Sequence, residues 1–164
     1  MEQLTNIVVA QGDLESITRL LEKLAQDTSA SHALLLDKSG QVIAAQQQSN
    51  ERDVVALGAL LAGAFSSSRQ VAEILGERDF RGILQQGVHE SIYTSLIGEH
   101  WLLVVAFDKQ THVGLVKVLA RRASDELERV LERALAGSAE AKEQVVNVQF
   151  RSSVENTIDY LFRD

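Results

Sequence analysis

Apolar and polar residues alternate along the chain with two periods, one typical of helices and one typical of strands. The first helical period starts after Asp13, a residue type that can cap a helix. Its apolar positions are Leu14, Ile17, Leu21 and Leu24. Two short apolar runs, 33–36 and 41–45, then flank a turn that contains Gly40 and predict a β-hairpin.

A second helix is predicted from Arg52 to Leu75, where the helical period returns over a length of roughly 36 Å. We expect one stripe of this helix to face the core: Val54, Leu57, Leu61, Ala64, Val71 and Leu75. Three strand-like segments follow and are separated by glycine-containing turns: 80–86, 91–97 and 101–107. A third helix is predicted from Thr111, which can cap it, to Ala136.

The order of these elements, αββαβββα, predicts an α+β fold in which a five-stranded, mainly antiparallel sheet carries helices on both faces. We expect this domain to span residues 1–137. The polar stretch after Gly137 is interpreted as a linker, so residues 138–164 form a linker and an amphipathic C-terminal tail helix. A helix this short needs a surface to pack against.

The composition narrows the classes of function. The chain has 164 residues and a net charge of −7, which argues against nucleic-acid binding. It has no cysteine, which excludes disulfides and thiolate metal sites. No run approaches the roughly 18 consecutive apolar residues of a bilayer-spanning helix, and the N-terminal residues lack the pattern of a signal peptide. We therefore expect a cytoplasmic protein with no membrane span.

No pattern typical of catalysis stands out. The phosphate-binding loop motif is missing, and no serine has the setting of a hydrolase nucleophile. The carboxylates belong to predicted helices and turns and form no evident acid–base pair. The four histidines lack the spacing of metal ligands: His32, His89, His100 and His112. We expect no enzyme activity, no cofactor and no metal site.

The predicted helix 52–75 carries a second stripe, made of small residues and offset from its core stripe. The stripe consists of Ala59, Ala62, Gly63 and Ser66, followed by Gln70. A glycine inside a helix costs about 1 kcal/mol relative to alanine, so Gly58 and Gly63 indicate that something approaches closely. The small-residue stripe could pack against the protein's own sheet. Alternatively, it could form a dimer interface together with a surface for a bound protein. We favour the second.

The order of elements and several short motifs resemble the Roadblock (dynein light chain) family, and above all its bacterial MglB-type members. The run Ala-Leu-Leu-Leu-Asp-Lys-Ser-Gly at 33–40 is similar to the family's first hairpin, and 57–75 is similar to its small-residue second helix. Residues 103–108 and 114–117 resemble the last strand and its entry into the third helix. The resemblance covers about residues 1–137 and extends to the tail motif at 158–162.

The resemblance implies a homodimer joined through the third strand, with the second helices paired on one face. It also implies a Ras-like GTPase partner of the MglA type, in motility or cell polarity. In that subfamily the regulator activates GTP hydrolysis by repositioning the GTPase's own catalytic residues, without an arginine finger.

We expect partner contacts from two groups of residues, with Arg69 at the periphery. They are Ala59, Ala62, Gly63, Ser66, Arg69 and Gln70, and in the tail Val154, Ile158, Leu161 and Phe162. Two alternatives stay open. One is a Roadblock scaffold or adaptor without effect on the nucleotide cycle. The other is a small-molecule sensor, which a buried polar pocket would favour.

Overall fold

The computed structural model describes residues 10–47 and 52–162, and for 141–146 the backbone alone. Three helices and five strands follow one another in the expected order. They are α1 (Gln11–Thr28), β1 (His32–Asp37), β2 (Val42–Gln47), α2 (Val54–Ile74), β3 (Gly82–Gln86), β4 (Glu90–Ile97), β5 (Trp101–Asp108) and α3 (Val113–Leu161).

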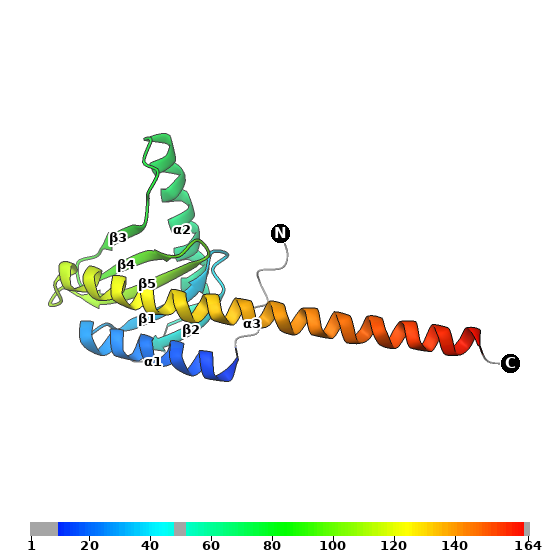
Figure 1. Cartoon of the computed structure of the whole chain (residues 1–164). Coiled ribbons are helices and arrows are strands. Elements are labelled where there is room, and N and C mark those ends of the chain that lie inside the picture. The colour runs from blue at the N-terminus through cyan, green and yellow to red at the C-terminus, as the bar shows by residue number, and fades with distance from the viewer. Residues whose placement is uncertain (1–9, 48–51, 163–164) are drawn as a thin grey trace.

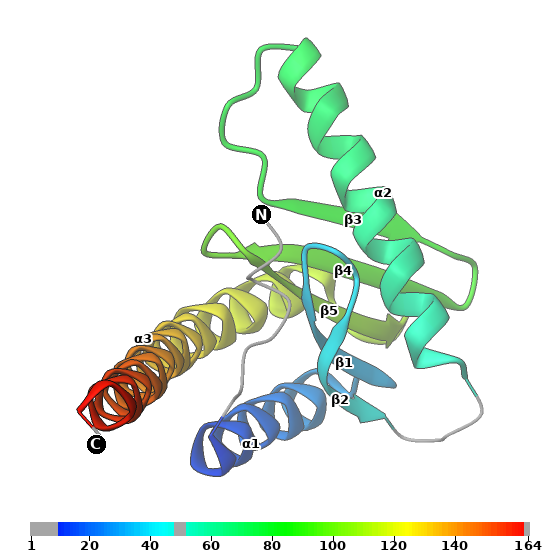
Figure 2. The ribbon, with the colours of Figure 1, turned by 90° about the vertical axis from the view of Figure 1, so that its right-hand side faces the viewer.

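The five strands form one sheet in the order β2-β1-β5-β4-β3, and all four neighbouring pairs are antiparallel. The sheet is flanked by α1 and α3 on one face and by α2 on the other (Figures 1 and 2). The predicted α+β fold is therefore confirmed. The edges of the sheet are β2 and β3, the two strands that have a single neighbour.

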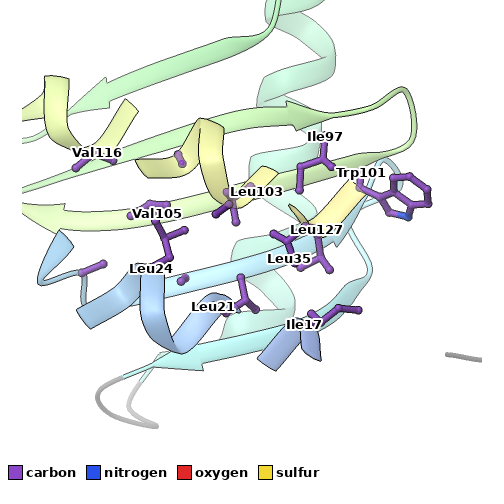
Figure 3. Packing of buried hydrophobic residues seen from close by; sticks show 14 of the residues in the cluster. Ile17, Leu21, Leu24, Leu35, Ile97, Trp101, Leu103, Val105, Val116 and Leu127 are labelled. Atoms are coloured by element: carbon purple, nitrogen blue, oxygen red, sulfur yellow. The ribbon is translucent and has the colours of Figure 1, made fainter. Parts of the chain in front are cut away.

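Side chains of the central strands alternate between two cores, because successive residues of a strand point to opposite faces. Leu35 and Leu103 enter the core under α1 and α3, where Leu21 and Leu127 close it from the helix side (Figure 3). The other core lies under α2 and contains Leu34, Leu36, Leu61, Ala62, Phe65, Leu102 and Val104. The near-continuous apolar runs of β1 and β5 thus follow from burial on both faces.

The helix starts differ in part from the prediction. Asp53 caps α2, where its carboxylate accepts a hydrogen bond from the Ala56 amide at 3.0 Å. Neither Asp13 nor Thr111 is a cap, so these two predictions were wrong. Asp13 lies inside the first turn of α1 and pairs with Arg133 at 3.4 Å. The Thr111 hydroxyl donates to the Thr28 carbonyl at 2.9 Å and joins the ends of α1 and α3.

The predicted linker after Gly137 is also wrong. Helix α3 runs without a break for 49 residues, about 74 Å at 1.5 Å per residue, and its last part extends beyond the domain (Figure 1). The reason lies in residues 139–144, which are alanine, glutamate, lysine and glutamine. These strong helix formers offset the cost of about 1 kcal/mol for Gly137. The tail is therefore the far end of α3.

Candidate partner-binding surfaces

Helix α2 packs on the sheet through one face, which is buried: Gly58, Leu61, Ala62, Phe65 and Ala72. At Gly58 a Cβ atom would lie 2.8 Å from the carbonyl oxygen of Gly40, in the β1–β2 turn. Gly58 is thus required by the close approach of the protein's own hairpin.

Ala62 is 3% exposed and belongs to the core under α2. The expectation that Ala62 contacts a partner was wrong. The expected core stripe is confirmed in its first part, where Leu61 is buried and Val54 and Leu57 pack against the core. It fails at its end, because Val71 and Leu75 are 57% and 79% exposed. Phe65 sets the rotation of the helix, since its ring packs on Phe80 with centroids 5.3 Å apart.

The outward face of α2 combines large apolar residues with small ones. Leu60 and Ile74 are 73% and 85% exposed, and a Cβ on Gly63 would meet no atom within 4 Å beyond the backbone of its own helix. We define the α2 surface as these exposed residues: Val55, Ala59, Leu60, Gly63, Ser66, Gln70, Val71, Ile74 and Leu75. By length and composition, α2 is the one helix in the described part of the chain that could cross a membrane. The apolar composition of α2 arises because the helix has two apolar faces. One of these faces packs on the sheet, and the other is exposed. An uncovered apolar stripe of this kind is typical of a protein interface.

Two cations lie beside the α2 surface. Lys38 projects from the β1–β2 turn, and both burial and the charge of Arg69 lower the pKa of its ammonium group. Arg69 itself is half-exposed and faces Glu73 at 3.8 Å, one helical turn away. Of the predicted residues on this helix, Ala59, Gly63, Ser66, Arg69 and Gln70 are thus accessible, and Ala62 is not.

A polar network holds the start of α2 to the sheet. Arg52, two residues before the helix, donates to the Glu90 carboxylate at 2.7 Å, and the Ser31 hydroxyl donates to the same carboxylate. Burial alone would raise the pKa of Glu90, but the bonds from Ser31 and Arg52 outweigh it and lower that pKa. His32 lies beside the network and is buried. Its burial and the Arg52 charge lower the pKa of its imidazole.

The predicted tail residues lie on the part of α3 that extends beyond the domain, away from α2 (Figures 1 and 2). All four are exposed: Val154, Ile158, Leu161 and Phe162. The exposed Phe150 continues their stripe toward the domain at spacing of four, and the sequence prediction missed it. The structure therefore presents two separate apolar surfaces, one on α2 and one on the tail.

Metal-binding and small-molecule sites are less evident in the described part of the chain than the two apolar surfaces. Within residues 10–47 and 52–162, no three His, Asp or Glu side chains cluster closely enough to hold a metal ion. A surface groove between α3 and the β3–β4 end of the sheet includes the hydroxyl-bearing Tyr93 and Ser95. Its charged residues balance in sign: Arg81, Lys117 and Arg121 against Asp79, Asp125 and Glu128. The charge of this groove selects no class of ligand, which gives the small-molecule alternative no support.

The profile of the Roadblock/LC7 domain matches residues 17–107. Three solved structures share the fold over most of the chain. Myxococcus xanthus MglB is 33% identical with a TM-score of 0.69, and the match covers 72% of this chain and 96% of that one. The gliding protein MglB from Thermus thermophilus is 32% identical with a TM-score of 0.71, over 77% and 96% of the two chains.

The third, an MglB with a tetrameric arrangement, is 32% identical with a TM-score of 0.73, again over 77% and 96%. The resemblance to the MglB-type members is thereby confirmed. The matched domain contains α2 and both edge strands, so the α2 surface lies within the shared fold.

Proposed function

This chain belongs to the Roadblock/LC7 domain family, and we propose that it is a non-catalytic, homodimeric regulator of a Ras-like bacterial GTPase of the MglA type. In this proposal it works in the cytoplasm, in motility or cell polarity, and stimulates GTP hydrolysis. The observation that carries the proposal is the α2 surface, an apolar stripe that the protein's own fold leaves uncovered.

The dimer is proposed to form through β3. This strand has β4 on one side and no strand on the other within the described residues, so its outer backbone groups are available for pairing. Antiparallel pairing of two β3 strands gives a self-complementary contact around a two-fold axis. It would place two α2 helices on the same face of one continuous sheet. Two copies of the α2 surface would then form a larger apolar platform.

The GTPase is proposed to bind on that platform. Small residues such as Gly63 and Ser66 let a partner's backbone approach, and Leu60 and Val71 supply apolar area. Lys38 adds positive charge to the rim, whereas Glu73 partly balances Arg69, so the rim favours a partner with an acidic residue opposite Lys38. Arg69 is held toward Glu73 and lies at the border of the stripe. This supports activation by repositioning of the GTPase's own residues, with Arg69 as a peripheral contact.

The tail offers a second contact. Residues 147–161 are helical and exposed, and their apolar stripe has no partner within the described domain. Burial of Val154, Ile158 and Leu161 against the GTPase would contribute several kcal/mol, at about 25 cal/mol per Å² of apolar area. The tail would then hold the GTPase while the α2 platform acts on its nucleotide site.

The direct test measures GTP hydrolysis by the Ras-like protein of the same organism, with and without this chain. We expect faster hydrolysis together with direct binding. Binding without any change in hydrolysis or nucleotide exchange would instead support the scaffold alternative.

A matched pair of variants locates the contact. Leu60→Asp and Val88→Asp each replace a strongly exposed apolar residue with the same acid, one on the α2 surface and one in the β3–β4 turn. We expect Leu60→Asp to lose GTPase binding at least tenfold and Val88→Asp to keep it, provided light scattering gives both the wild-type mass. Equal behaviour of the two variants would remove the GTPase from α2.

A further inference from the structure

On the far side of the sheet from α2, a groove between the outer faces of α1 and α3 is lined by positively charged residues. We define the basic groove by its four cations, Arg19 and Lys23 from α1 and Arg129 and Arg133 from α3. Glu126 is the one acidic residue among the groove's lining residues. We propose that the basic groove docks an acidic amphipathic helix of a second protein partner, distinct from the GTPase.

Among the described residues, three of the four cations of the groove have no ion-pair partner. Arg133 has a carboxylate partner, Asp13, at 3.4 Å. Arg19, Lys23 and Arg129 have no carboxylate within 4.0 Å in the described part of the chain, although the whole chain carries a net charge of −7. Acidic side chains are therefore plentiful in this protein, but Asp13 and Glu126 balance only part of the charge of this site. Cations held together without partners favour an acidic ligand, because each gains an opposite charge on binding.

The shape of the groove suits a helix. α1 and α3 run antiparallel, since Asp13 and Arg133 meet at one end and Thr28 and Thr111 meet at the other. The furrow between two such helices accepts the side chains of a third helix, as in a helical bundle. Leu20 and Val130 also line the groove, but Val130 is 8% exposed and Leu20 is half-buried, so the apolar part of the lining is narrow. A helix with a narrow apolar stripe and acidic flanks matches this lining.

The surroundings of the groove disfavour a membrane or a nucleic acid. Glu15 and Glu22 lie on the outer side of α1, and Glu126 lies within the groove itself. A bilayer of anionic lipids or a phosphate backbone presents negative charge uniformly and would meet these carboxylates as well. A protein helix can place a basic residue opposite each of them and acids opposite the cations, so a protein fits the mixed pattern better.

The position of the groove makes this inference independent of the proposed function. The sheet separates the basic groove from the α2 surface, so a partner in the groove would not compete with a protein bound to α2 (Figure 2). The chain would then connect two proteins through opposite faces of one sheet.

The experiment uses the full chain and a synthetic amphipathic helix about five turns long, with a leucine stripe and glutamate flanks. A second peptide with the same stripe and lysine flanks, and vesicles that contain phosphatidylglycerol, are the comparison ligands. The groove variant combines Arg19→Glu and Arg129→Glu. The matched variant, Lys109→Glu with Arg121→Glu, makes the same change of charge at exposed positions outside the groove.

We expect the glutamate peptide to bind the wild type and the matched variant, and to bind the groove variant about tenfold more weakly. Its affinity should fall with added salt, since exposed ion pairs are screened. Stimulation of GTP hydrolysis should not change. The proposal is overturned if the glutamate peptide does not bind, if both peptides bind equally, or if both variants weaken binding equally. Binding of the vesicles in place of the peptide would make the groove a membrane surface and would also overturn it.

Discussion

Two neighbouring residues of α2 should respond in opposite ways to the same substitution. Ala62 is 3% exposed in the core under α2, whereas a Cβ on Gly63 would meet no atom within 4 Å beyond the backbone of its own helix. Ala62→Arg forces a long cation between the helix and the sheet. Gly63→Arg places the same cation in solvent on the α2 surface. Comparison of the two variants therefore tests the rotation of the helix about its axis.

The magnitudes follow from the two environments. Overpacking a core typically costs about 1–3 kcal/mol, and an unpaired buried charge adds a comparable or larger amount. Ala62→Arg should therefore lose about 3–6 kcal/mol, a large part of the roughly 5–15 kcal/mol that stabilises a domain. Gly63→Arg should gain up to about 1 kcal/mol, because glycine is among the poorest helix formers and arginine is a good one.

The assay is urea unfolding followed by circular dichroism, with dimer mass and GTPase binding measured on the same samples. Gly63→Arg should be fully folded and should lose GTPase binding tenfold or more, since the cation separates two packed surfaces. If Ala62→Arg were as stable as the wild type, the packing of α2 on the sheet would be refuted. A Gly63→Arg dimer with normal GTPase binding would instead refute the partner site on α2.

Three further predictions concern the core, the tail and pH. Leu127→Ala should lower the free energy of unfolding by about 2–5 kcal/mol, with GTPase binding unchanged in the folded fraction, measured by urea unfolding and titration. Removal of residues 139–164 should leave a folded dimer by light scattering but change GTPase affinity or nucleotide exchange; an unaltered profile would exclude the tail. Because burial lowers the pKa of His32 from 6.5, the unfolded chain binds its proton first, and stability should fall as pH drops below about 6.5. His32→Gln should flatten this dependence below about pH 6.5, and equal slopes in the two proteins would contradict this role of His32.

The fold could be predicted from the sequence because each strand and helix carries its own signal. β1 and β5 are short apolar runs bounded by turns, and the first part of α3 has a clear helical stripe that includes Leu127. These hydrophobic periods are reliable because the apolar positions are the ones that the fold buries. The order of the elements then restricts the architecture to a sheet with helices on both faces.

The outer limits of the buried face of α2 could not be predicted, so Ala62, Val71 and Leu75 were misplaced, because this helix is apolar on two faces. The hydrophobic period of a helix identifies its buried face only when the opposite face is polar. On α2 the residues Ala62 and Val71 are both apolar, yet Ala62 is 3% exposed and Val71 is 57% exposed, the reverse of the predicted order. Only the packing of Phe65 on Phe80 and the contact of Gly58 with the hairpin turn decide between them. That information lies in distant residues.

The continuity of α3 was missed for a different reason. Gly137 and Ser138 resemble a break, but helix propensity acts as a sum over many residues, and those that follow favour the helix. The basic groove was missed because its cations come from two helices that are distant in sequence. Arg19 and Lys23 on one helix, and Arg129 and Arg133 on the other, look like ordinary solvated faces until α1 and α3 lie side by side.

The two proposed contacts differ in chemistry in a way that the fold explains. α2 covers its side of the sheet alone, so an apolar helix flank stays exposed and suits a large, desolvated contact with a GTPase. α1 and α3 cover the other side together and bury their apolar residues against each other and the sheet. The groove that remains between them is lined mainly by charged residues, which suits a salt-sensitive, exchangeable partner. A change of ionic strength should therefore release the partner of the basic groove while the protein bound to α2 stays in place.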